Sequence, residues 1–161
     1  MKKLLILPLF AVSFLLTGCG VSVVDYNDKI YIQTDNCITA ENLIWTAMEE
    51  ENYGMAKTLH ATALETCMVA QAEVEAMGAF EDDSSFRDIA NEFLQTEVAY
   101  LTKYAEALPY RDIEEFTDEE RAAYEAINEE LSVLEEKGYA LNEELLTIQV
   151  EFADKHGYEL E

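Results

Sequence analysis

The longest regular segment of the chain, TDEERAAYEAINEELSVLEEKGYALNEELLTIQVEFADK (residues 117–155), decides its fold class. Apolar residues recur there every three or four positions, which is the repeat of an amphipathic α-helix. Thr117 and Glu120 match a capping box, so we predict a helix from Asp118 to Lys155, about 57 Å long if straight. Its expected core stripe is Tyr124, Ile127, Leu131, Leu134, Gly138, Leu141, Leu145, Ile148 and Phe152, and Gly138 could bend it.

Two earlier segments show the same periodicity. A helix should begin after the Ser22–Asp25 capping pattern and end at the break Glu51-Asn52-Tyr53-Gly54, although Lys29 to Gln33 could form a short strand instead. The next helix should reach Met77, with Gly78 as its C-cap. The first helix carries two parallel apolar rows, Val23, Ile30, Cys37, Ile44 and Val24, Tyr31, Ile38, Trp45.

A further helix should open at a capping box from Ser85 to Asp88 and stop at Pro109. Short connections between four helices favour antiparallel neighbours. We therefore predict one all-α domain over residues 23–161, an antiparallel up-down-up-down four-helix bundle.

The N-terminus is typical of an export signal. Lys2 and Lys3 precede the apolar run Leu4–Leu16, which is too short to span a bilayer. The sequence that follows, Leu16-Thr17-Gly18-Cys19, resembles the lipobox of bacterial lipoproteins. We predict that residues 1–18 are a cleaved lipoprotein signal peptide, that Cys19 is lipidated, and that residues 19–22 form a short tether. No acidic residue follows Cys19 directly, so we expect the outer membrane or cell surface rather than the inner membrane.

The chain is strongly acidic, with 34 Asp and Glu against 10 Lys and Arg and a formal net charge of −24 at pH 7. Binding to nucleic acid depends on basic residues that neutralise phosphates, so no nucleic-acid partner is expected. The charge suits a cationic partner, and it is also typical of a solvated surface that resists aggregation, which is the simpler interpretation.

Cys37 and Cys67 are expected at the same height on the apolar faces of two helices folded about Asn52. In an oxidising envelope they can form a disulfide. The alternative is a pair of buried free thiols.

Metal and haem motifs are largely missing. His60 and His156 lack the Glu-x-x-His pattern of di-iron bundles, and no C-x-x-C-H haem motif occurs. Three alternatives remain: a b-type haem between His60 and Met55, a calcium site at residues 81–84, and a weak metal site at Asp154, His156 and Glu159. We expect structural roles for all of these residues. We predict no cofactor and no enzymatic activity.

Three stretches together resemble the leptospiral-type surface lipoprotein family: Tyr26–Ile30 with Gln33, Phe80–Asp88, and Phe152–Tyr158. The resemblance implies a helical bundle at the bacterial envelope and no catalytic residues. For the middle stretch we expect a stabilising role, in which Phe80 and Phe86 are buried at the bundle end, Arg87 pairs with a loop carboxylate and Asp88 closes the cap. The residues that match the family pattern are Tyr26, Asn27, Asp28, Phe80, Asp83, Phe86, Arg87, Asp88, His156 and Gly157.

The function that these observations predict is a non-catalytic binding or structural role, exerted by a lipid-anchored envelope protein. Its lipid would attach it to the membrane, and its acidic surface would face an envelope protein partner. The alternative is a helical bundle that binds a small ligand or a metal ion. The oligomeric state is left open.

Overall fold

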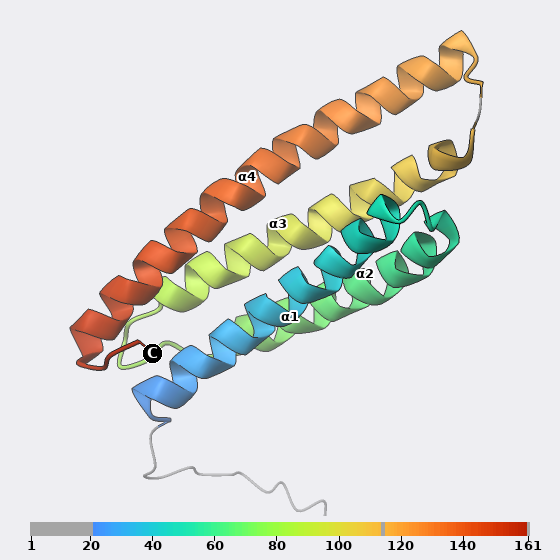
Figure 1. The fold of residues 1–161 in the computed structure, drawn as a ribbon. Coiled ribbons are helices and arrows are strands. Elements are labelled where there is room, and N and C mark those ends of the chain that lie inside the picture. The colour runs from blue at the N-terminus through green and yellow to red at the C-terminus, as the bar shows by residue number, and fades with distance from the viewer. Residues whose placement is uncertain (1–20, 114, 161) are drawn as a thin grey trace, which may run out of the picture.

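The computed structural model describes residues 21–113 and 115–160, and within these ranges the chain is a four-helix bundle. The helices run up, down, up and down in chain order (Figure 1), which confirms the predicted all-α fold. Their bounds are α1 Val23–Glu49, α2 Tyr53–Glu75, α3 Ser85–Ala107 and α4 Asp118–His156, and a 3-10 turn η1, Leu108–Asp112, follows α3. Residues 29–33 belong to α1 and not to a strand.

The ends of α1, α3 and α4 follow local chemistry that the sequence carries. Ser22 accepts a hydrogen bond from the Asp25 amide, and Thr117 and Glu120 form a complete capping box. Gly157 ends α4 with φ 72°, a left-handed conformation that glycine adopts without steric cost. Pro109 lies in the first turn of η1, where the α-helical pattern stops.

Two predicted caps are wrong. α2 ends at Glu75 with Ala76 as its C-cap, and Gly78 does not adopt a positive φ. Ser85 is the first residue of α3 and not its cap, because the Ser85 amide donates to Asp83 Oδ1 at 3.0 Å. The loop carboxylate thus caps α3, since it offers a charged acceptor to an amide that has no partner inside the helix.

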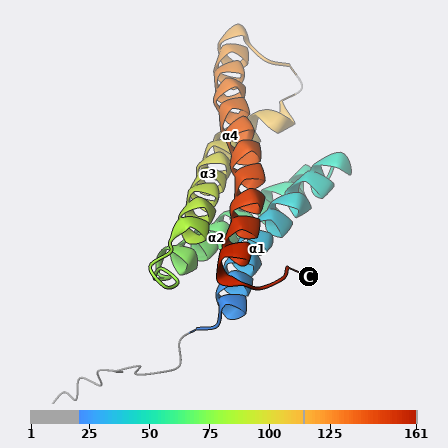
Figure 2. The same cartoon turned by 90° about the vertical axis from the view of Figure 1, so that its left-hand side faces the viewer.

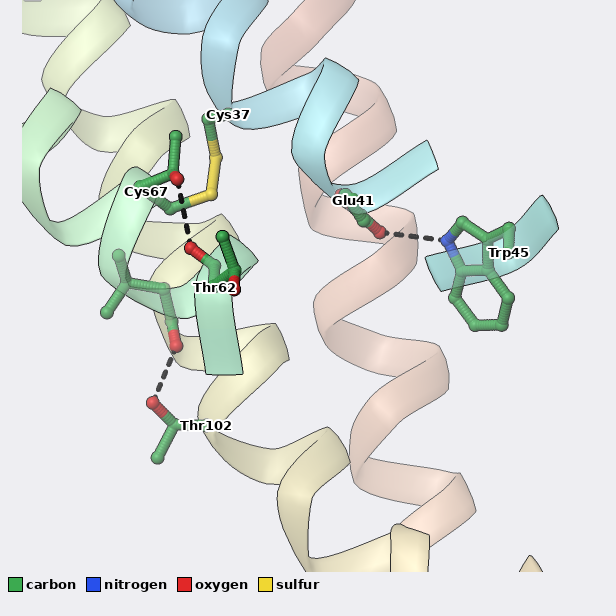
Figure 3. The surroundings of a disulfide bond; sticks show 8 residues. Cys37, Glu41, Trp45, Thr62, Cys67 and Thr102 are labelled. Atoms are coloured by element: carbon green, nitrogen blue, oxygen red, sulfur yellow. Dashed lines mark hydrogen bonds between the residues drawn. A yellow bond between two sulfur atoms is a disulfide. The ribbon is translucent and has the colours of Figure 1, made fainter. Parts of the chain in front are cut away.

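α1 and α2 form a tightly packed pair. Cys37 and Cys67 are joined by a disulfide with an S–S distance of 2.00 Å and a Cα–Cα distance of 4.7 Å, which confirms the predicted bridge (Figure 3). Both cysteines are fully buried, and small residues on α2 (Ala56, Ala63 and Ala70) are buried on the same helix face. Small side chains allow this close approach of the two backbones.

The bundle is closed on three sides and nearly open on the fourth. α1 packs on α2, α2 on α3 and α3 on α4, whereas α1 and α4 make few contacts. Figure 2 shows that the α1/α2 pair and the α3/α4 pair lie close at one end and diverge toward the other. As a result, the second apolar row of α1 is only partly covered: Val24 and Tyr31 are exposed, and Ile38 and Trp45 are half-buried.

The predicted signal peptide and the lipidation site Cys19 lie outside the described residues. Among the described helices, none has both the length and the apolar composition needed to cross a membrane.

Replacement of both bridge cysteines by alanine should destabilise the bundle. The bridge closes a loop with a sequence separation of 30 residues, so its loss should lower the free energy of unfolding by roughly 3–4 kcal/mol. Urea titration of the Cys37→Ala/Cys67→Ala variant beside the oxidised protein measures this difference. The single variants serve as controls, because each breaks the bridge and should lose a similar amount. A loss below about 1 kcal/mol would show that the bridge contributes little.

Candidate functional site

A cleft between α1, α3 and α4 is the strongest candidate for a binding site. It lies where the two helix pairs diverge, on the open side of the bundle, and has a volume of about 190 Å³. Its walls combine aromatic side chains with carboxyl groups. The lining residues are Ile38, Glu41, Asn42, Trp45, Phe93, Glu97, Tyr100, Glu135, Gly138, Tyr139 and Asn142.

Two carboxyl groups meet in this cleft. Glu97 of α3 has only 8 % of its surface exposed, and it lines the cleft together with Glu41 of α1. The indole Nε1 of Trp45 donates a hydrogen bond of 3.2 Å to Glu41 Oε1 (Figure 3). Two like charges at close range repel each other, so a neighbouring carboxylate favours the neutral form of a buried carboxyl group.

Burial favours the neutral form of Glu97. Removal from water raises the pKa of Glu97 to about 9, and the nearby carboxyl group of Glu41 acts in the same direction. Glu97 is therefore protonated at neutral pH. Among the ion pairs of the described residues, none includes Glu41, Glu97 or Glu135, so no described side chain supplies a cation that replaces this proton.

Aromatic groups form the rest of the cleft. Tyr100 is buried one turn after Glu97, and desolvation raises its pKa above the ordinary value, as do the nearby charges of Glu41 and Glu135. Tyr139 lies at the rim, where its hydroxyl donates to Glu135 Oε1 at 3.4 Å and the charge of Glu135 raises its pKa. Phenol hydroxyls thus stay neutral beside the carboxyl pair and can donate or accept hydrogen bonds.

Gly138 of α4 makes room for Glu97. It is buried, and a Cβ atom at this position would lie 2.7 Å from Glu97 Oε1. The helix runs without interruption through Gly138. The glycine that could have bent α4 therefore has a different role, which is to let a carboxyl group reach the helix backbone.

Sequence reasoning missed Glu41 and Glu97. A signal for Glu97 was present, because it lies on the apolar stripe of its helix between Phe93 and Tyr100, where a carboxylate is out of place. A glycine on the stripe of the last helix and an excess of apolar residues on the first were further signs. Sequence alone could not show that all of these meet in one cleft.

The residues of the family resemblance gather elsewhere, at the end of the bundle where the helix pairs converge. An aromatic cluster there consists of Tyr26, Phe80, Phe86, Phe152 and His156, with ring centroids 4.5–5.7 Å apart. Phe86 is buried and Phe80 half-buried. The Tyr26 hydroxyl donates to the Gly78 carbonyl at 2.9 Å, which ties α1 to the loop between α2 and α3.

Asp83 is the polar centre of this end. Its Oδ2 accepts from Lys155 Nζ at 2.6 Å and lies 3.2 Å from His156 Nε2, and its Oδ1 accepts from the Ser85 hydroxyl. These hydrogen bonds, led by that of Lys155, hold the pKa of Asp83 far below its usual range. Lys155 and His156 lie at the end of α4, so their contacts with Asp83 link this helix to the loop before α3.

The expected pairing of Arg87 with a loop carboxylate is wrong. Arg87 donates from Nε to its neighbour Asp88 at 2.9 Å and from Nη1 to the Met77 carbonyl at 2.9 Å. Asp88 accepts from the Ser84 hydroxyl and does not cap the first amide of α3, which Asp83 takes.

The remaining residues of the resemblance also have protein partners. Asn27 is buried, accepts from Gln149 Nε2 at 2.8 Å and donates to Asp28 at 3.2 Å.

His60 is far from this end: it is buried, and its Nε2 lies 2.7 Å from the Leu101 carbonyl of α3. Within the described residues, no group of three or more His, Cys, Asp or Glu side chains is arranged to hold a metal ion.

Replacement of Glu97 by glutamine should change how stability depends on pH. Between the ordinary carboxyl pKa of 4.5 and the raised value of about 9, the folded protein holds a proton that the unfolded chain has lost. The wild-type free energy of unfolding should therefore fall as pH rises through this window, by at most about 1.4 kcal/mol per pH unit. Glutamine is neutral throughout, so Glu97→Gln should lack this fall, as urea titrations at pH 5, 7 and 9 would show.

The matched control is Glu136→Gln on exposed surface of α4, whose pH profile should run parallel to that of the wild type. Parallel profiles for Glu97→Gln and the wild type would contradict a protonated, buried Glu97.

A second pair of substitutions tests the contact between Gly138 and Glu97. Alanine is favoured over glycine in a helix interior by about 1 kcal/mol, but in the wild type its Cβ would collide with the buried carboxyl group. We expect Gly138→Ala to stabilise the protein by about 1 kcal/mol in a Glu97→Ala background, and to give less stabilisation in the wild type, where the end of the Glu97 side chain has to shift. A double-mutant cycle measures this coupling, and equal effects in both backgrounds would rule the contact out.

Comparisons of the chain with protein-family models, curated proteins and solved structures found no match.

Proposed function

We propose that this chain is a lipid-anchored protein of the bacterial envelope, with a non-catalytic role in which its acidic surface binds a basic protein partner. One observation carries the proposal: nearly all of the negative charge faces solvent. Among the acidic residues that the structure describes, Asp83 and Glu97 are buried, and the others are half-buried or exposed.

The exposed face of α4 is the clearest part of this surface. Glu129, Glu136 and Glu143 recur every seven residues and are all exposed, so they share one side of the helix. Such a row of like charges does not contribute to the core and repels anionic surfaces. It attracts basic partners, and added salt shortens the distance over which this attraction acts.

Two further observations support an envelope location. α1 begins at Val23, so few residues would separate a lipidated Cys19 from the bundle. The disulfide between Cys37 and Cys67 is typical of proteins that fold in an oxidising compartment. A protein held by acyl chains also needs no membrane-spanning helix.

The anchor is tested by expression of the full chain in a bacterial host and separation of membrane and soluble fractions. We expect the protein in the membrane fraction, with an acylated N-terminal peptide by mass spectrometry. Cys19→Ser should move it to the soluble fraction. A wild-type protein recovered unmodified in the cytosol, with residues 1–18 still attached, would refute the proposal.

The role of the acidic face is tested by cross-linking in intact envelopes. Glu129→Gln/Glu136→Gln/Glu143→Gln should reduce the yield of a cross-linked partner several-fold, and so should an increase from 0.1 M to 1 M salt, because screening shortens the range of the attraction from about 10 Å to 3 Å. Aspartate at the same three positions keeps the charge and should keep the yield. A yield that neither charge nor salt alters would contradict an electrostatic interface.

A further inference from the structure

The cleft between α1, α3 and α4 holds two carboxyl groups, Glu41 and Glu97, and among the described residues no basic side chain lines it. Glu97 is more than nine-tenths buried and lines the cleft beside a second carboxyl group, that of Glu41. Buried carboxylates in proteins are usually matched by a positive group. No ion pair of the described residues supplies one here, and the cleft beside the two carboxyl groups has a volume of about 190 Å³.

The walls of the cleft suit an organic cation. Trp45, Tyr100 and Tyr139 line it together with apolar side chains of Ile38 and Phe93. Aromatic faces attract a cation within about 6 Å of the ring, more strongly where water is excluded. An apolar stem of the same ligand would be covered by the aliphatic and aromatic walls.

A metal ion fits less well. Calcium and magnesium take six or more oxygen ligands, whereas no group of three or more candidate metal-binding side chains is found in the described part of the chain. The volume also exceeds that of the ~150 Å³ engineered cavity that holds a benzene molecule, so the cleft has room for a group of about six heavy atoms.

We propose that this cleft binds a primary ammonium group on an aliphatic stem, and that the ammonium group is held between the carboxyl groups of Glu41 and Glu97. An ammonium group has three donors around one atom, which suits two carboxylates and a phenol oxygen. A guanidinium group is a planar fork better matched to a single carboxylate. The ligand is either a free alkylamine or the side chain of a lysine in another protein.

The exchange balances in atoms and charge. One positive ammonium group enters the site as the proton of Glu97 leaves to solvent, so the total charge of the site does not change. The groups that face this pair are Tyr100 from α3 and Glu135 and Tyr139 from α4, and both tyrosines stay neutral because their pKa values are raised. This proposal does not depend on the lipid anchor or on the acidic face of α4.

The chain carries its own reporter, because Trp45 is its single tryptophan and lines the cleft. The purified full chain, in non-ionic detergent, is titrated with n-pentylammonium, 1,5-diaminopentane and N-acetyl-lysine-N′-methylamide while Trp45 fluorescence is followed. We expect saturable binding of at least one of these, tighter by up to about tenfold per pH unit between pH 6 and 8, since one proton leaves. The diamine and the capped lysine distinguish a free amine from a lysine side chain as the source.

Two measurements separate this site from a merely apolar one. 1-Pentanol has the same stem without the charge and should bind at least tenfold more weakly, and calorimetry in two buffers of different ionisation enthalpy should give close to one proton released at pH 7. The second measurement needs no variant, so it stands even if a substitution fails to fold.

Variants then assign the groups. Glu97→Gln and Glu41→Gln should each weaken ammonium binding at least tenfold at pH 8 and flatten its pH dependence, whereas Glu125→Gln, at an exposed position of α4 outside the cleft, should leave both unchanged. The proposal is overturned if pentanol binds as tightly as pentylammonium, if no amine binds, if binding releases no proton, or if calcium or magnesium displaces the amine at equal concentration.

Discussion

The close approach of α1 and α2 at Cys37 and Cys67 shapes the whole bundle. Small residues on α2 let the two backbones come within 4.7 Å at this point, and the disulfide fixes that distance. α1 and α2 therefore form one unit, and α3 packs mainly against its α2 side. α4 then has α3 as its main partner, and the side between α1 and α4 is left open for much of its length. The side between α1 and α4 is open because each of these helices packs mainly against another partner, α1 against α2 and α4 against α3.

The two ends of that open side are built differently. At one end the aromatic cluster and Asp83 join α1, α4 and the loop before α3, so the helix pairs converge there. Toward the other end the pairs diverge, and the space between them holds a carboxyl pair where an apolar core would be more stable. The raised pKa of Glu97 keeps this buried group neutral, which makes its burial tolerable. Proteins commonly accept such a local loss of stability where a site has to bind something.

Much of the fold could be predicted from the sequence, because helix periodicity, caps and short connections are local properties. The stripe from Tyr124 to Phe152, the Thr117 cap and the cysteine register all depend on spacing along one or two helices. The cap of α3 could not be predicted in the same way, since Ser85 and Asp83 are equally plausible acceptors until the loop geometry is known. The cleft was out of reach for a stronger reason: Glu41, Glu97 and Gly138 belong to three helices, and only the angle between helix pairs brings them together.

The order of helix contacts along the chain has a consequence for how the protein forms. Each large interface joins helices that follow one another in sequence, and the first and last helices scarcely touch. Closing such short loops costs little chain entropy, so the bundle belongs among the topologies of low contact order that assemble within micro- to milliseconds. α1 and α2 can pair before α4 has been synthesised. A nascent chain can thus gain stable structure one helix at a time.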